Sequence, residues 1–168
     1  MEKFVGRKLM LIKGIIDEDF VNYNLGAMYI ATASCSFKCD KECGGSYCQN
    51  SSLANAPSKN IATDNIIKRY LHNPITKAII FSGLEPFDQF FELFDFIQKL
   101  RLDYNCKDTV VIYTGYTEDE ISAEIKVLQK FPNIIVKFGR FIPNEKPKYD
   151  KVLGVKLASP NQYGKRIS

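Results

Sequence analysis

Residues 77–100 read Lys-Ala-Ile-Ile-Phe-Ser-Gly-Leu-Glu-Pro-Phe-Asp-Gln-Phe-Phe-Glu-Leu-Phe-Asp-Phe-Ile-Gln-Lys-Leu and contain one complete strand–turn–helix unit. The run at 77–81 is short and mostly apolar, which is typical of a strand buried on both faces. Residues 87–100 carry apolar side chains at 87, 90, 91, 94, 97 and 100, the spacing of one helical face. A buried strand followed by an amphipathic helix is the repeating unit of a parallel sheet.

The rest of the chain continues this alternation of strands and helices. We expect further strands at 8–13, 27–33, 109–113, 133–136 and 151–157, and helices at 64–71 and 118–130. Asp64 and Thr117 are the expected helix caps, with Glu120 at the capping-box position after Thr117. The order of elements predicts an α/β fold with a mostly parallel sheet, right-handed crossovers and a single domain over residues 1–168.

The composition excludes several classes of protein. Of the 168 residues, 45% are hydrophobic and 25% are charged, which is typical of a globular domain and argues against disorder. The formal net charge of +4 is too small to call for a nucleic-acid partner. No apolar run approaches the roughly 18 residues of a membrane span, and residues 1–14 lack the apolar core of a secretory signal. We therefore expect a cytoplasmic protein that binds neither nucleic acid nor membrane.

The cysteines are unevenly distributed along the chain. Four of the five, Cys35, Cys39, Cys43 and Cys48, fall within fourteen residues, and Cys106 lies apart. In a reducing compartment such clustering indicates metal ligation before disulfides. The segment 35–60 that carries them has no periodicity and is expected to be a long functional loop.

An iron–sulfur cluster is the favoured occupant of this loop, because several thiolates in one short segment can share a cluster. Lys38 and Lys41 are expected to lower the pKa values of the thiols. Zinc is the rival metal, but structural zinc sites usually draw ligand pairs from two separated segments. Four unliganded cysteines are the least favoured interpretation.

Polar or glycine-bearing segments follow each predicted parallel strand. They are the cysteine loop, Ser82–Pro86, Thr114–Thr117 and Lys137–Arg140. Because sites in such sheets form at the carboxyl ends of the strands, we expect these segments to meet at one edge.

Five motifs, in order, resemble those of the radical S-adenosylmethionine superfamily, and in particular the activating proteins of anaerobic (class III) ribonucleotide reductases. The resemblance covers roughly residues 25–166 and is carried by the cysteine loop, Ser82-Gly83-Leu84-Glu85-Pro86, Tyr113-Thr114-Gly115-Tyr116, Phe138-Gly139-Arg140-Phe141 and Ala158-Ser159-Pro160-Asn161-Gln162.

This resemblance implies a partial (β/α) barrel, a 4Fe-4S cluster held by three cysteines, and S-adenosylmethionine bound at the remaining iron. It implies reductive cleavage of S-adenosylmethionine to a 5′-deoxyadenosyl radical. The implied partners are a glycyl radical enzyme, the anaerobic ribonucleoside-triphosphate reductase, and an electron donor such as flavodoxin or ferredoxin.

The resemblance also assigns residues to this chemistry. Cys35, Cys39 and Cys48 match the cluster ligands and are the catalytic residues, with Cys43 as the alternative third ligand. We favour Cys48 because an aromatic residue, Tyr47, precedes it and because Cys48-Gln49-Asn50 matches the family's Cys-x-Asn ending. The residues that match cofactor-binding positions are Tyr47, Ser82, Gly83, Glu85, Thr114, Gly115 and Asn161.

The chain departs from the family pattern at three places. No cysteine pair closes the usual C-x2-C, Leu84 replaces a glycine, and Lys137 replaces an aspartate. Two alternatives therefore stay open. One is a divergent radical S-adenosylmethionine enzyme with another protein or small-molecule substrate. The other is a non-catalytic iron–sulfur or zinc module that uses all four loop cysteines.

Overall fold

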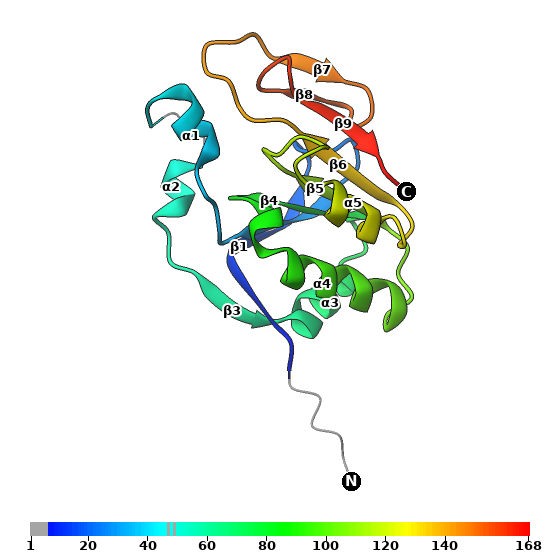
Figure 1. Ribbon diagram of the computed structural model, residues 1–168. Coiled ribbons are helices and arrows are strands. Elements are labelled where there is room, and N and C mark those ends of the chain that lie inside the picture. The colour runs from blue at the N-terminus through cyan, green and yellow to red at the C-terminus, as the bar shows by residue number, and fades with distance from the viewer. Residues whose placement is uncertain (1–6, 47, 49) are drawn as a thin grey trace.

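The computed structural model describes residues 7–46, 48 and 50–168 and is built on a seven-stranded sheet (Figure 1). In spatial order the strands are β3 (Lys59–Ala62), β1 (Leu9–Asp19), β2 (Ala27–Thr32), β4 (Ala78–Gly83), β5 (Thr109–Tyr113), β6 (Ile134–Phe138) and β9 (Tyr163–Arg166).

The four central strands, β2, β4, β5 and β6, run parallel, as the alternation of strands and helices predicts. The flanking pairs β1–β2, β1–β3 and β6–β9 are antiparallel. Over the described residues the sheet is open, with β3 and β9 at its edges, and does not close into a barrel. The prediction was therefore right about the parallel centre, but it missed the antiparallel strands at both edges.

Three helices cover one face of the sheet: α3 (Thr63–His72), α4 (Phe90–Leu102) and α5 (Ser122–Leu128). The predicted caps were wrong. The N-cap of α3 is Ala62, and Asp64 lies inside its first turn. Helix α5 begins at Ser122, although the backbone N–H of Thr117 does donate to Glu120 at 2.9 Å.

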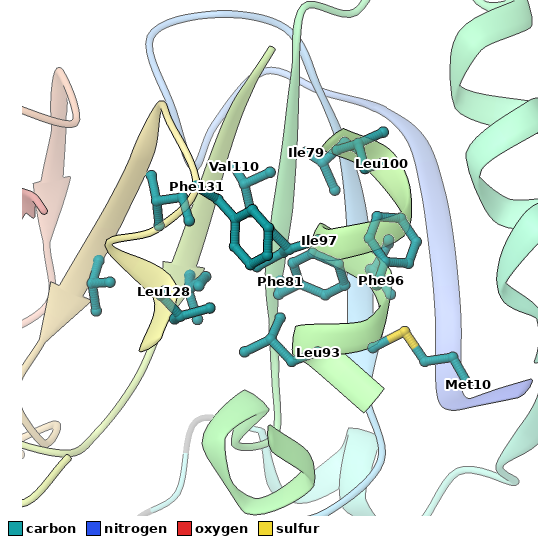
Figure 2. Packing of buried hydrophobic residues seen from close by; sticks show 14 of the residues in the cluster. Met10, Ile79, Phe81, Leu93, Phe96, Ile97, Leu100, Val110, Leu128 and Phe131 are labelled. Carbon is teal, nitrogen blue, oxygen red and sulfur yellow. The ribbon is translucent and has the colours of Figure 1, made fainter. Parts of the chain in front are cut away.

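The core on the helical face is formed by alternate residues of the central strands and by the buried sides of the helices. Figure 2 shows Phe81 of β4 against Phe96 of α4, with ring centroids 4.9 Å apart in an edge-to-face arrangement. A short 3₁₀ helix, η1 (Pro86–Gln89), precedes α4. The expected apolar stripe is confirmed except at Phe91, which is 85% exposed, and Leu93 and Phe96 are buried in addition to it.

The opposite face of the sheet is covered by a two-stranded hairpin, β7 (Lys148–Asp150) and β8 (Val155–Leu157). Leu153 and Leu157 pack there on small and branched residues of the sheet. Because strand side chains alternate between faces, Ile135 points toward this hairpin side and Val136 toward the helices. The next residue, Lys137, therefore returns to the hairpin side.

The segment expected to be one loop is partly ordered into α1 (Lys38–Cys43), α2 (Ser51–Ala54) and β3. Figure 1 shows α1 and α2 set apart from the three helices that cover the sheet. Within the described ranges, no helix has the length and hydropathy needed to cross a membrane.

Candidate metal centre and adjoining cavity

A cavity of about 330 Å³ lies at the carboxyl ends of the four parallel strands. Residues from each of the segments expected to meet at this edge contribute to its lining, which confirms that expectation. Those that carry the argument below are Cys35, Cys39, Cys48, Glu85, Thr114 and Lys137.

The end of β4 reaches this edge through Gly83, whose φ of 95° lies in a region that favours glycine. A Cβ atom here would stand 2.8 Å from the Cα of Ala31 on β2. The close approach of β2 and β4 therefore requires a residue without a side chain. The turn after it carries Glu85 into the cavity.

The carboxylate of Glu85 is buried and accepts three hydrogen bonds. Its Oε1 accepts from the Thr114 hydroxyl at 2.7 Å and from the Phe87 backbone N–H at 3.1 Å. Its Oε2 accepts from the Gly115 backbone N–H at 2.8 Å. These donors come from the turn after β5 and from the start of η1, so three protein groups fix the position of one carboxylate.

The two buried charged groups of the cavity, Glu85 and Lys137, have shifted pKa values. Burial raises the pKa of Glu85 to about 7, although its hydrogen bonds from Gly115 and Thr114 oppose the shift. Burial lowers the pKa of Lys137 to about 8, opposed by the negative charges of Glu85 and Cys39. The pKa of each group therefore changes when a charged ligand enters the cavity.

Three of the clustered cysteines line this cavity: Cys35, Cys39 and Cys48. Burial raises the pKa of Cys35 to about 11 and raises that of Cys39. The charge of Cys48 adds to both upward shifts. Without metal the thiols of Cys35 and Cys39 stay protonated at neutral pH.

Cys43 lies one helical turn after Cys39 on α1 and is not among the described residues that line the cavity. Cys48, and not Cys43, therefore lines the cavity together with Cys35 and Cys39. Asn50, which follows in the Cys-x-Asn ending, also lines the cavity. Tyr47 lies outside the described residues.

The cations that act on the thiols differ from those expected. Lys137 and Arg140, and not Lys38 or Lys41, are the cations that oppose the upward pKa shift of Cys39. The Lys38 ammonium lies over the ring of Tyr116, 4.4 Å from its centroid. The expectation that the lysines of the cysteine loop lower the thiol pKa values is therefore not supported.

Arg140 holds α1 against the sheet. Its guanidinium forms ion pairs with Glu42 of α1, at 3.1 Å, and with Glu120, at 2.6 Å. This fixes the helix that carries Cys39 relative to the end of β6.

Not every predicted binding residue reaches the cavity. Ser82, Thr114 and Gly115 line it, whereas Asn161 is exposed and donates to the Arg140 carbonyl oxygen at 2.8 Å. Its neighbour Gln162 is buried and lines the cavity instead. Sequence analysis noted Lys137 as a departure from the family pattern but did not include it among the cofactor-binding residues, although strand alternation from the apolar residues of β6 would have placed it on the cavity side.

A family model described as a 4Fe-4S single cluster domain matches residues 27–159, well over half of the chain. The chain belongs to this family. The matched range contains all four clustered cysteines and the cavity residues from β4, β5 and β6. No curated protein and no solved structure matches the chain.

The donor set fits the 4Fe-4S cluster of this family, because three thiols line one cavity and thiolates are the usual ligands of such clusters. Among the described residues, no group of three or more histidine, cysteine or acidic side chains lies close enough together to hold a single metal ion. Membership of the 4Fe-4S family favours an iron–sulfur protein over the zinc alternative.

Proposed function

We propose that this protein is a radical S-adenosylmethionine enzyme, with a partial barrel of that superfamily's type. One observation carries the proposal: the three cysteines and the polar strand-end residues Glu85, Thr114 and Gly115 line the same cavity. A closed electron-transfer cluster has no need of an adjoining cavity with a buried carboxylate.

Cys35, Cys39 and Cys48 would hold the cluster and leave one coordination position open. When bound, the cluster supplies that open iron and the electron that breaks the sulfonium bond of S-adenosylmethionine, giving methionine and a 5′-deoxyadenosyl radical. The protein positions the ligand and excludes water. Glu85 accepts a hydrogen bond from the ligand's ammonium group, and its own three hydrogen bonds hold its carboxylate in place.

The proposed client is a glycyl radical enzyme, the anaerobic ribonucleoside-triphosphate reductase, with a flavodoxin or ferredoxin as electron donor in the cytoplasm. The ordered motifs support this assignment.

Anaerobic reconstitution with iron and sulfide tests the chemistry. We expect about four irons per chain, and methionine and 5′-deoxyadenosine on addition of S-adenosylmethionine and reductant. The triple variant of Cys35, Cys39 and Cys48 to Ala is the control and should bind no cluster. A reconstituted wild-type protein that holds its cluster and never cleaves S-adenosylmethionine would refute the proposal.

The client requires a separate experiment. Incubation with the reductase should produce a glycyl-radical doublet in the electron paramagnetic resonance spectrum. S-Adenosylmethionine cleavage without this doublet would favour the divergent enzyme, which acts on another substrate. A cluster spectrum that S-adenosylmethionine leaves unchanged would favour the non-catalytic module.

A further inference from the structure

The segment that carries Cys35 and Cys39 has little stability of its own. Residues 34–37 have no regular secondary structure, and α1, which follows them, has six residues and buries none of them. Its N-cap residue, Phe37, has a φ of 55° and forms no side-chain capping hydrogen bond. Isolated helices this short are unstable in water. Contacts with the rest of the fold therefore have to fix the relative position of the two cysteines.

The turn between β4 and α4 holds the chain on either side of Cys35. The backbone N–H of Glu85 donates to the carbonyl oxygen of Ser34, just before this cysteine, at 2.8 Å. The Oδ2 of Asp88 accepts a hydrogen bond from the backbone N–H of Ser36, just after it, at 2.8 Å. The first of these bonds joins two backbones, whereas the second depends on one carboxylate.

Tyr116, in the turn after β5, contacts both this carboxylate and the helix that carries Cys39. Its hydroxyl donates to Oδ1 of Asp88 at 2.5 Å, so the carboxylate bridges the tyrosine and the backbone of Ser36. The ammonium group of Lys38, the residue before Cys39, lies over the tyrosine ring, 4.4 Å from its centroid. The segment between the two cysteines is thus attached to one side chain near both of its ends.

The remaining contacts of Tyr116 fix it to the sheet. Its backbone N–H donates to the Thr114 hydroxyl at 3.0 Å, and its carbonyl oxygen accepts from the Gly139 N–H at 3.1 Å. The Arg140 guanidinium also lies over its ring, 5.9 Å from the centroid. Burial raises the pKa of Tyr116 to about 12, opposed by a hydrogen bond with the side chain of Ser36, which is a second contact with that residue.

Tyr116 lies beside the cysteines but is not among the described residues that line the 330 Å³ cavity. Together with Cys35 and Cys39 it lines a separate space of about 20 Å³. The tyrosine is therefore placed to act on the two cysteines without contacting a ligand in the large cavity.

We propose that Tyr116 is a positioning residue for the cluster: through Asp88 and Lys38 it holds the segment that carries Cys35 and Cys39 in its cluster-binding conformation. The inference rests on the proposed function for the assignment of these two cysteines as ligands. A segment that is ordered in advance loses less conformational freedom on binding, so the cluster is held more tightly.

A competing explanation is that Tyr116 only packs against the core, since its side chain lies at the edge of the hydrophobic cluster on the helical face. Tyr116→Phe separates the two explanations, because it keeps the ring for packing and for Lys38 but removes the hydroxyl. Tyr116→Leu removes the ring as well. Tyr104→Phe is the matched control, because the Tyr104 hydroxyl donates to Asp64 at 2.7 Å and neither residue lines a cavity that contains the cysteines.

Asp88 offers a second set of variants at an exposed position, where substitution is not expected to unfold the chain. Asp88→Ala removes the bridge. Asp88→Asn can keep it, because the amide oxygen accepts from the Ser36 N–H and the amide nitrogen donates to the Tyr116 hydroxyl. If the hydroxyl acts through this side chain, the double variant Tyr116→Phe/Asp88→Ala should be no more impaired than Asp88→Ala.

The test measures how firmly the cluster is held. The first-order rate of iron release to a chelator is followed on the anaerobically reconstituted protein, and this rate does not depend on the fraction of chains loaded. Visible circular dichroism of the bound cluster reports the arrangement of the thiolates around it. Urea denaturation of the cluster-free proteins establishes that each variant keeps the fold.

We expect Tyr116→Phe to release iron three- to tenfold faster than the wild type, as for the loss of one hydrogen bond, and to change the visible circular dichroism. Tyr116→Leu should release it faster still. Tyr104→Phe should stay within twofold of the wild type, and Asp88→Asn should be slower than Asp88→Ala. A folded Tyr116→Phe that takes up no cluster would be the extreme form of the expected result.

Three results would overturn the inference while the proposed function stands. They are a release rate for Tyr116→Phe less than threefold above the wild type, an equal acceleration in Tyr104→Phe, and a double variant more than twofold faster than Asp88→Ala. Wild-type protein that takes up no cluster would overturn both the inference and the proposed function.

Discussion

The hydroxyl of Thr114 donates to the carboxylate of Glu85 at 2.7 Å and links the ends of two neighbouring parallel strands, β4 and β5. Both side chains are buried. The bond lies at the edge where the polar segments of the sheet converge. It orients the carboxylate in the folded chain, so that the acceptor is in position before any ligand binds.

Removal of this hydroxyl should therefore destabilise the protein. Thr114→Val keeps the shape of the side chain but deprives a buried carboxylate of one donor, which typically costs about 1–3 kcal/mol. Urea denaturation under anaerobic conditions measures the change in the free energy of unfolding. Thr114→Ser keeps the hydroxyl, so its loss in the free energy of unfolding should be less than half that of Thr114→Val. Equal losses in the two variants would mean that the methyl packing, and not the hydrogen bond, carries the effect.

The raised pKa of Glu85 predicts how stability depends on pH. A carboxyl with an ordinary pKa of 4.5 in the unfolded chain and about 7 in the folded one favours folding when protonated. Its contribution is fully present below pH 4.5 and is lost as the pH rises through 7. The loss is on the order of 3 kcal/mol. The depressed pKa of Lys137 acts in a separate window, since its contribution is lost as the pH falls from 10.5 through 8.

Glu85→Gln removes the carboxyl and should flatten the stability profile of the cluster-free protein between pH 4.5 and 7. Urea midpoints of the wild type and the variant, measured at half-unit intervals of pH, provide the comparison. Glu92→Gln, a partly buried position outside the cavity lining, should keep the wild-type slope. Parallel profiles for wild type and Glu85→Gln would contradict the shifted pKa.

The choice between Cys43 and Cys48 as third ligand can be decided by single substitutions. Cys48→Ala should reduce bound iron to below half of the wild-type value and abolish the cluster's visible absorbance. Cys43→Ala should retain both, because Cys43 does not line the cavity with the other cysteines. Iron analysis after anaerobic reconstitution measures the difference. A full complement of iron in Cys48→Ala would remove the basis of the three-cysteine assignment.

Sequence analysis predicted the parallel strands and the convergence of the strand-end segments, because both follow from local hydrophobic patterns and one topological rule. It missed β9, a strand of mostly exposed residues whose sequence lacks an apolar run. It also placed Phe91 in the buried stripe and left out Leu93 and Phe96, although the other five positions of the stripe were right. The partners of Lys137 include the Thr114 carbonyl oxygen and the Tyr113 ring, which come from the neighbouring strand β5 and the turn after it, and no local pattern encodes these contacts.

The approach of β2 to β4 leads to a fourth prediction. Gly83→Ala places a methyl group against the backbone of Ala31 at a positive φ, so we expect a loss of at least about 2 kcal/mol in the free energy of unfolding. Gly14→Ala on β1 is the control, since its added Cβ meets nothing within 4 Å. That variant should match or slightly exceed the wild type in urea denaturation. Comparable stabilities of the two variants would contradict the close approach of the strands.

The last prediction concerns Arg101, a buried cation whose partners are all backbone carbonyls. Its Nε and Nη2 donate to the Pro132 carbonyl oxygen at 3.1 and 2.9 Å, and its Nη1 and Nη2 reach those of Cys106 and Asp108 at 2.8 and 2.9 Å. One side chain on α4 thereby donates hydrogen bonds to backbone carbonyl groups in the loops that lead into β5 and β6. It holds two of the strands whose far ends form the cavity.

Arg101→Met should therefore cost about 3 kcal/mol or more, because it leaves several buried carbonyls without donors. Arg69→Met is the matched control. It breaks a two-bond ion pair with Asp17, but both side chains are about half exposed, and exposed pairs contribute roughly 0–1 kcal/mol. Urea denaturation of both variants under anaerobic conditions separates a buried carbonyl network from a surface ion pair. Similar losses would mean that the packing of the helix, and not these hydrogen bonds, holds β5 and β6 in place.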